Sequence, residues 1–391
     1  MLAHSPSLPL VIDYFGDNFT AEDEEGIFLA LAQRDRVRRI RFLIPFLKLR
    51  NLIIAIDGEY PILEYLILGD RSEEKSTVLI LPETLQTPHL RHAVIEGSVP
   101  MRFQLLTTAV GLVTLGLSSH HPSTYFHPAV IHQSLSLMPQ LEILEIVFYF
   151  AVPNRDVERQ LMRTPITTHV TLSNLRLFSF LAVSAYSEAV LSGITAPRLE
   201  NFQIGYHKQL TFSVPRLMQF IGGTESLRFN RTRFEFGRYR GLVRVNPPET
   251  DTQVTQLDAF GIFVECWHLD WQVSSMAQIS NSLSQIFSTV EHLTLAHNGH
   301  SRSSEEHNEV ELTEWRKLLR SFTNVKTLRI DDRLVGELSG CLRLDDGEHP
   351  GGLLPELRDL IYSGSSNADD ALAPFIDARQ NAGRPVTLIK S

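Results

Sequence analysis

Apolar residues recur along the chain in a six-residue pattern, apolar-x-x-apolar-x-apolar. Twelve such units can be placed, and their starts lie 22 to 35 residues apart. The second position is charged in 11 of the 12 units, although only 21% of all residues are charged. The units begin at Val37, Leu63, Leu90, Leu112, Leu141, Leu175, Leu199, Thr224, Leu257, Val290, Val325 and Leu357. This regularity indicates internal repeats.

Each unit predicts one short strand followed by a helix. The last part of the unit alternates apolar and polar positions, which is typical of a strand with one buried face. Apolar residues at helical spacing between the units predict helices over 129–137, 214–221, 275–287 and 312–322, and part of one over 45–52. A strand and a returning helix in about 30 residues make one parallel layer, and such layers must stack to bury their apolar faces.

The spacing and the pattern resemble leucine-rich repeats. The ninth position, where that family places Asn or Cys, is matched only by Asn298. We therefore expect an α/β fold, an irregular leucine-rich-repeat-like solenoid. Its parallel sheet is expected on the concave face, with helices and loops on the convex face.

The repeats also predict the domain organisation. Residues 1–36 are expected to form an N-terminal capping segment, and residues 37–391 a solenoid of about 12 units. Alternating arginines and apolar residues around Gly237 predict a solvated hairpin inserted at 231–245. Polar loops are expected as insertions at 297–311 and 345–352.

Net charge and cysteine content indicate which binding partners and which cellular compartment to expect. The formal net charge is −9, so the chain as a whole does not attract nucleic acid or an anionic membrane. Two cysteines, Cys266 and Cys341, do not make a disulfide framework. No apolar run approaches the roughly 18 residues of a membrane span. We expect a cytoplasmic or nuclear protein without a membrane or nucleic-acid partner.

Motifs of common enzymes are not found. The sequence has no GxSxG, P-loop, HExxH or strand-linked GxGxxG. His297 and His300 have a metal-ligand spacing but lie in a polar stretch, and the acidic stretch at 345–348 lacks an EF-hand pattern. The basic and aromatic run at 228–244 could bind an anion or RNA, but its alternation favours the hairpin. We expect no enzyme activity, cofactor or metal.

Four segments carry a closer resemblance. These are Ser7–Tyr14 (SLPLVIDY), Asp35–Phe42 (DRVRRIRF), Tyr60–Leu66 (YPILEYL) and Thr87–Arg91 (TPHLR). Their order resembles the repeat region of fungal F-box proteins with degenerate leucine-rich repeats. The resemblance implies a target-recognition region of a ubiquitin-ligase receptor. No segment reads as the F-box helices that open with L-P-x-E-[IL], so binding of the ligase adaptor is not expected.

In a leucine-rich solenoid the third, fifth and seventh positions of each unit point to the concave face. These positions are polar with some apolar exceptions, which suits a protein partner, unless loops cover them. The chain is therefore expected to be a non-enzymatic interaction module. Alternatives are a truncated or F-box-less fragment with a structural or no dedicated role, and a hydrolase or metal enzyme using the histidine loop. The expected binding residues are Arg39, Arg41, Tyr65, His92, Glu96, Asn201, Gln203, Arg228, Asn230, His292, Thr294, Arg329, Asp331 and Asp359.

Overall fold

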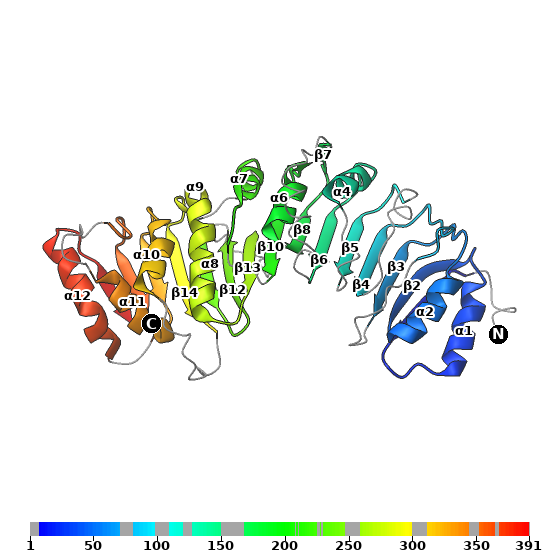
Figure 1. Cartoon of the computed structure of the whole chain (residues 1–391), viewed down its shortest axis with the longest axis horizontal. Coiled ribbons are helices and arrows are strands. Elements are labelled where there is room, and N and C mark those ends of the chain that lie inside the picture. Colours follow the sequence, from blue (N-terminus) through cyan, green and yellow to red (C-terminus); the bar gives the residue numbers. More distant parts are fainter. Residues whose placement is uncertain are drawn as a thin grey trace. The chain divides into compact units, whose positions relative to one another are not determined.

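The computed structural model describes most of the chain, in two compact units, Met1–Leu199 and Glu200–Ser391 (Figure 1). The described residues are 8–70, 81–97, 109–119, 127–149, 168–207, 209, 211–224, 227, 230–246, 259–298, 311–343, 352–363 and 367–390. The predicted loop insertion at 345–352 therefore lies almost wholly outside the described residues, and so does most of that at 297–311.

In the described part of the first unit, seven parallel strands follow one another in chain order. They are β1 (Leu10–Phe15), β2 (Val37–Ile44), β3 (Tyr65–Asp70), β4 (His92–Gly97), β5 (Thr114–Ser119), β6 (Ile143–Phe148) and β8 (Leu177–Ala182). Two-residue strands β7 (Val170–Thr171) and β9 (Ile194–Thr195) pair separately. The range predicted as a cap, 1–36, contains β1, which pairs with β2 and extends this sheet by one strand.

A recurrent turn explains where these strands begin. The backbone N–H of Leu63 donates to the carbonyl of Tyr60, and that of Leu90 donates to Thr87 in the same way. Pro61 and Pro88 thus occupy the second position of a four-residue turn, where the fixed φ of proline is favoured. The leucine is fully buried, and the strand starts two residues later. The turn fixes which residues of the strand enter the core.

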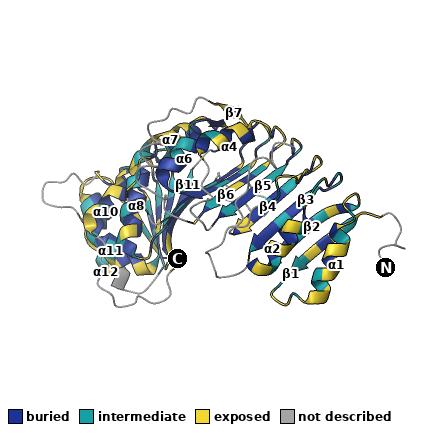
Figure 2. Cartoon of the chain, turned by 45° about the vertical axis from the view of Figure 1, so that its right-hand side comes forward, coloured by how far each residue is buried: buried dark blue, intermediate teal, exposed yellow. Residues whose placement is uncertain are grey.

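Helices cover one face of this sheet. They are α1 (Ala21–Leu31), α2 (Phe46–Ala55), α4 (Pro128–Leu135) and α6 (Ser184–Leu191). α2 packs on β2 and β3, and α6 packs on β8. Strand residues such as Ile40 and Phe42 are fully buried, whereas the alternate residues are mostly half-buried or exposed. The exposed outer turns of the helices and the buried strand positions are distinguished in Figure 2.

Among its described residues, the second unit has eight strands, all parallel except one. In spatial order they are β10 (Asn201–His207), β13 (Phe260–Glu265), β12 (Arg240–Asn246), β11 (Arg231–Phe236), β14 (His292–His297), β15 (Thr327–Ile330), β16 (Asp359–Tyr362) and β17 (Thr387–Lys390). β12 is the exception, because it runs antiparallel to both β11 and β13.

The segment predicted as a solvated hairpin forms β11 and β12. It is not a solvated projection, because it lies within the sheet between β13 and β14. Phe234, Phe236, Val243 and Val245 are fully buried. The alternation that predicts a hairpin is equally typical of two core strands, and burial of their apolar face explains why the pair joins the sheet.

The helices of the second unit are α7 (Pro215–Gly222), α8 (Leu269–Ser282), α9 (Ser284–Phe287), α10 (Leu312–Arg320), α11 (Asp332–Leu342) and α12 (Asn367–Asn381). They agree with the predicted ranges at α7, α8, α9 and α10, whereas the sequence pattern does not predict α11 and α12. α8 packs on β11, β12 and β13, and α11 packs on β14. The helices predicted at 129–137, 214–221, 275–287 and 312–322 are confirmed, although α8 begins six residues earlier than its predicted range.

The expected mixed α/β architecture with a large, mostly parallel sheet is thus present. In the part of the chain that the structure describes, no helix has the length and apolar character needed to cross a bilayer.

Candidate functional site: the open face of the sheet

The strand face opposite the one that buries Ile40 and Phe42 is called the open face below. In the first unit, strand register aligns its residues into rows that cross the strands. The first row consists of Arg39, Tyr65, His92, Thr114, Ile143 and Leu177. The second row consists of Asp13, Arg41, Ile67, Val94, Gly116, Glu145 and Ser179. Neighbours within a row lie about 5 Å apart, so their side chains can touch.

An aromatic stack occupies the centre of the first row. The rings of Tyr65 and His92 are nearly parallel, with an interplanar angle of 5° and centroids 4.4 Å apart. The guanidinium carbon of Arg39 lies 5.8 Å from the centroid of the Tyr65 ring, and His92 Nδ1 is 3.1 Å from the hydroxyl of Thr114. Four strands therefore contribute to one continuous cluster of a cation, two rings and a hydroxyl.

The environment of His92 favours its neutral form. Burial is the main cause that lowers the pKa of His92, and the positive charge of Arg91 adds to the effect. Glu64 and Glu142 oppose this shift without cancelling it. Near pH 7 the imidazole is therefore an uncharged aromatic ring within this cluster, and it can also form a hydrogen bond.

Asp13 of β1 lies between two arginines. Its carboxylate is 3.4 Å from Arg39 and 3.7 Å from Arg41, and the side chains are about one-third exposed. Such exposed pairs contribute between about 0 and 1 kcal/mol to stability, so their main effect is to orient the two guanidiniums. Because one carboxylate faces two guanidiniums, this end of the open face keeps a positive charge.

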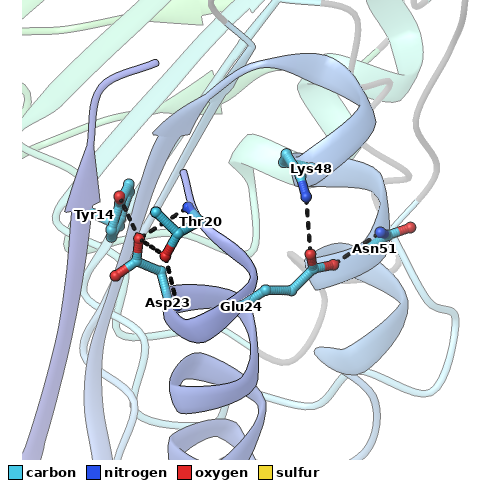
Figure 3. A network of polar contacts seen from close by, with 6 residues as sticks. All are labelled: Tyr14, Thr20, Asp23, Glu24, Lys48 and Asn51. Atoms are coloured by element: carbon cyan, nitrogen blue, oxygen red, sulfur yellow. Dashed lines mark hydrogen bonds and ion pairs between the residues drawn. The ribbon is translucent and has the colours of Figure 1, made fainter. Parts of the chain in front are cut away.

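A polar network holds β1 and its neighbouring helices in place (Figure 3). Thr20 and Asp23 form a reciprocal capping box at the start of α1, and the hydroxyl of Tyr14 donates to the Asp23 carboxylate at 2.9 Å. Hydrogen bonds from Thr20, and then from Tyr14, lower the pKa of Asp23. Glu24 accepts from Lys48 and Asn51 of α2 at 3.1 and 2.9 Å. Since Tyr14 adjoins Asp13, this network fixes the strand that orients Arg39 and Arg41.

The other end of the open face is apolar. Ile143 and Val147 of β6, Leu177 of β8 and Val94 of β4 are all half-buried on this face. Leu181 has the same orientation but is nearly fully buried. Charged and aromatic residues over β1–β4 thus give way to mostly aliphatic residues over β6 and β8, where Glu145 and Ser179 are the polar members of the same face. Contiguous apolar area with a polar rim is typical of a protein-binding surface.

The open face of the second unit is more polar. Its central row consists of Gln203, Gly261, Arg244, Arg233, Thr294 and Arg329. Glu235 pairs with Arg233 at 2.6 Å and lies 3.8 Å from Arg244. A second row contains Arg231, His292, Thr327 and Asp359. These rows bring Gln203, His292, Thr294, Arg329 and Asp359 onto one surface, as the repeat pattern predicts.

Several predicted residues do not belong to this surface. Asn230 precedes β11, and the next residue, Arg231, lies opposite His292 on the neighbouring strand. The residues that face outward here are therefore one position later in the sequence than the repeat pattern predicts. Asp331 accepts a hydrogen bond from the backbone N–H of Arg333 and caps α11. Asn201 is buried. Glu96, by contrast, does lie on the open face of the first unit, because strand register places it in a third row between Gly69 and Ser118. Arg228 lies outside the described residues.

The candidate chemical clusters add nothing to the site. His300 and the acidic stretch 345–348 lie outside the described residues. Within the described ranges, no three His, Cys, Asp or Glu side chains are grouped so that they could hold a metal ion. The predicted residues do not include Asp13, Thr114, Arg233 and Arg244. Thr114 occupies a third position of the pattern, whereas strand register is needed to place Asp13, Arg233 and Arg244 on this face.

Comparisons with known proteins do not add a family. No protein-family model matches the sequence, and a search of the curated proteins finds no significant match.

Proposed function

We propose that the chain is a non-enzymatic protein-interaction module that binds a protein partner through the open face of its first unit. We also propose that its layers form an irregular leucine-rich-repeat-like solenoid. By its resemblance to fungal F-box proteins, its role is target recognition of the kind performed by a ubiquitin-ligase receptor. The partner then binds without any chemical step on this chain.

One observation carries the proposal. The row from Arg39 through Tyr65 and His92 to Ile143 and Leu177 places a cation, two aromatic rings and aliphatic side chains next to one another on an accessible surface. Arg and Tyr are enriched among residues that dominate binding energy, and half-buried apolar neighbours exclude water around them. None of these side chains is required to fill the core between sheet and helices.

The test compares two double variants in a quantitative affinity capture. Arg39→Ser with Tyr65→Ser removes the central cluster from the open face. Leu47→Ser with Arg50→Ser removes an apolar and a cationic side chain that α2 exposes. We expect the first variant to lose at least one wild-type partner by about tenfold or more, which corresponds to about 1.4 kcal/mol, and the second to retain it.

Circular dichroism and thermal unfolding verify that both variants fold like the wild type. If the open-face variant recovers every wild-type partner at the wild-type level, the proposed surface is wrong. Asp331 is not included in the variant, because its role as a cap of α11 would mix stability with binding.

A further inference from the structure

A second candidate surface, remote in sequence from the first, carries the exposed residues Tyr239 and Trp267, whose rings meet, and Trp271, whose ring contacts His268. Their exposed fractions are 48%, 64% and 41%. Tyr239 lies in the turn between β11 and β12, and Trp267 lies between β13 and α8, whose first turn contains Trp271. The third tryptophan of the chain, Trp315, is fully buried. We call the three exposed residues the aromatic patch.

The aromatic patch is held in a fixed arrangement by buried polar contacts. The amide of Gln272, a buried residue of α8, donates to the carbonyls of Gly237 at 2.7 Å and Cys266 at 2.9 Å. The backbone N–H of Cys266 donates to the carbonyl of Tyr239 at 3.1 Å. The turn of the hairpin and the start of α8 are therefore tied together, and the rings of Tyr239 and Trp267 meet edge to face with centroids 4.8 Å apart.

This rigidity lowers the entropic cost of binding. Large aromatic side chains that are fixed before a partner arrives lose little freedom on association. The exposed rings leave apolar area in contact with water, which is unfavourable and adds little to the stability of the fold. Trp and Tyr are also the residues most enriched among those that dominate binding energy. The patch therefore has the properties of a preformed binding surface.

Charge indicates which partner fits. Arg238 and Arg240 flank the patch and are exposed, and the guanidinium carbon of Arg238 lies 5.0 Å from the Tyr239 ring centroid. Among the described residues, neither arginine forms an ion pair with a carboxylate. Glu265 lies opposite Arg240 in the strand register, but its carboxylate pairs with His207. Two exposed cations that form no ion pair beside exposed aromatic rings are complementary to a negatively charged ligand.

We propose that the aromatic patch and its two arginines bind an acidic peptide segment of a partner protein. An apolar side chain of the segment packs on Trp267 and Tyr239, while neighbouring Asp or Glu residues meet Arg238 and Arg240. Nucleic acid fits less well, because affinity for a phosphate backbone grows with the number of cations and only two are present. This site lies in the second unit and does not depend on the open face of the first unit.

The test is a selection of random peptides displayed on phage, with the full-length chain as the target. We expect the recovered peptides to be enriched in Asp and Glu next to aliphatic or aromatic residues. Synthetic copies of them should change the fluorescence of the exposed tryptophans and protect these from quenching by acrylamide. Trp267→Ser and Arg238→Glu with Arg240→Glu should each weaken the binding of these peptides by about tenfold or more.

Matched controls separate this effect from a general change of the surface. Leu312→Ser removes another exposed apolar residue of the second unit, and Arg50→Glu with Arg198→Glu reverses two exposed charges elsewhere. Both controls should bind the peptides like the wild type. The proposal is overturned if no acidic peptide is recovered, if Trp267→Ser binds unchanged, or if single-stranded RNA binds more tightly than the peptides.

Discussion

The imidazole of His92 lies flat against the phenol ring of Tyr65, and the two rings come from adjacent parallel strands. Tyr65 thereby shields one side of His92 from water. Burial is the main cause that lowers the pKa of this histidine. The stack therefore links the charge state of the open face to the presence of a single aromatic side chain.

Replacing Tyr65 should change the titration of His92. In Tyr65→Ala the imidazole becomes more exposed, so its pKa should rise towards the ordinary value of about 6.5. Proton NMR of the ring hydrogens across the acid and neutral range measures this shift. Tyr65→Phe keeps the stacked ring and should titrate like the wild type. An unchanged titration in Tyr65→Ala would show that the stack does not shield His92.

Buried His132 should make the protein less stable in mild acid. Its Nε2 donates to the carbonyl of Val190 at 2.7 Å, and burial is the main cause that lowers its pKa. The folded state then binds fewer protons than the unfolded state. This contribution to stability is complete above about pH 6.5 and is lost as the pH falls through the lowered pKa of the folded state.

Denaturant unfolding at about pH 7.5 and about pH 5 measures the effect of His132. His132→Gln retains an N–H donor without a titrating ring, so its unfolding free energy should fall less between the two pH values. His89→Gln changes an exposed histidine and serves as the control. Equal acid sensitivity of wild type and His132→Gln would contradict the prediction.

Neither cysteine should react in the native protein. Burial is the main cause that raises the pKa of Cys266 to about 12, and Cys341 is also buried. The thiolate is the nucleophile, so labelling by an aromatic disulfide at about pH 8 should be slow for the folded chain. Both thiols should react promptly in denaturant. A rapid reaction of one thiol per native chain would refute this expectation.

The capping box of α1 should contribute measurably to stability. Thr20→Ala removes the hydroxyl that accepts from the Asp23 backbone and donates to its carboxylate. Loss of such a cap costs about 1 kcal/mol of unfolding free energy. Thr20→Ser keeps the hydroxyl and should remain close to the wild type. Thermal unfolding of the three proteins gives the comparison, and equal midpoints for Thr20→Ala and the wild type would argue against the cap.

The positions of most strands follow from local sequence. In nine of the units the strand begins at the third residue. In eight of these a preceding turn, closed by a backbone hydrogen bond, places the first apolar residue in the core. The turn and the alternation both act over a few residues, so a repeat pattern captures them. The shared orientation of Arg39, Tyr65 and His92 follows for the same reason.

The pattern failed where long-range pairing decides the structure. The unit at Thr224 predicts a strand that includes Asn230, whereas β11 begins at Arg231 and pairs with β12 and β14. Alternation identifies two strands but not their neighbours in the sheet. Likewise, Trp267 and Trp271 lie four residues apart, which also suits a buried helix face, and their contact with Tyr239 depends on the hairpin turn.

The reversed strand β12 has a consequence for synthesis on the ribosome. In the first unit each new strand can join the previous one as soon as it emerges. In the second unit β10 pairs with β13, yet β11 and β12 are translated between them. Until β13 is complete, one edge of β10 has no strand to join. We expect growth of the nascent sheet to pause at this point, where the unpaired edge is a natural place for a chaperone to bind.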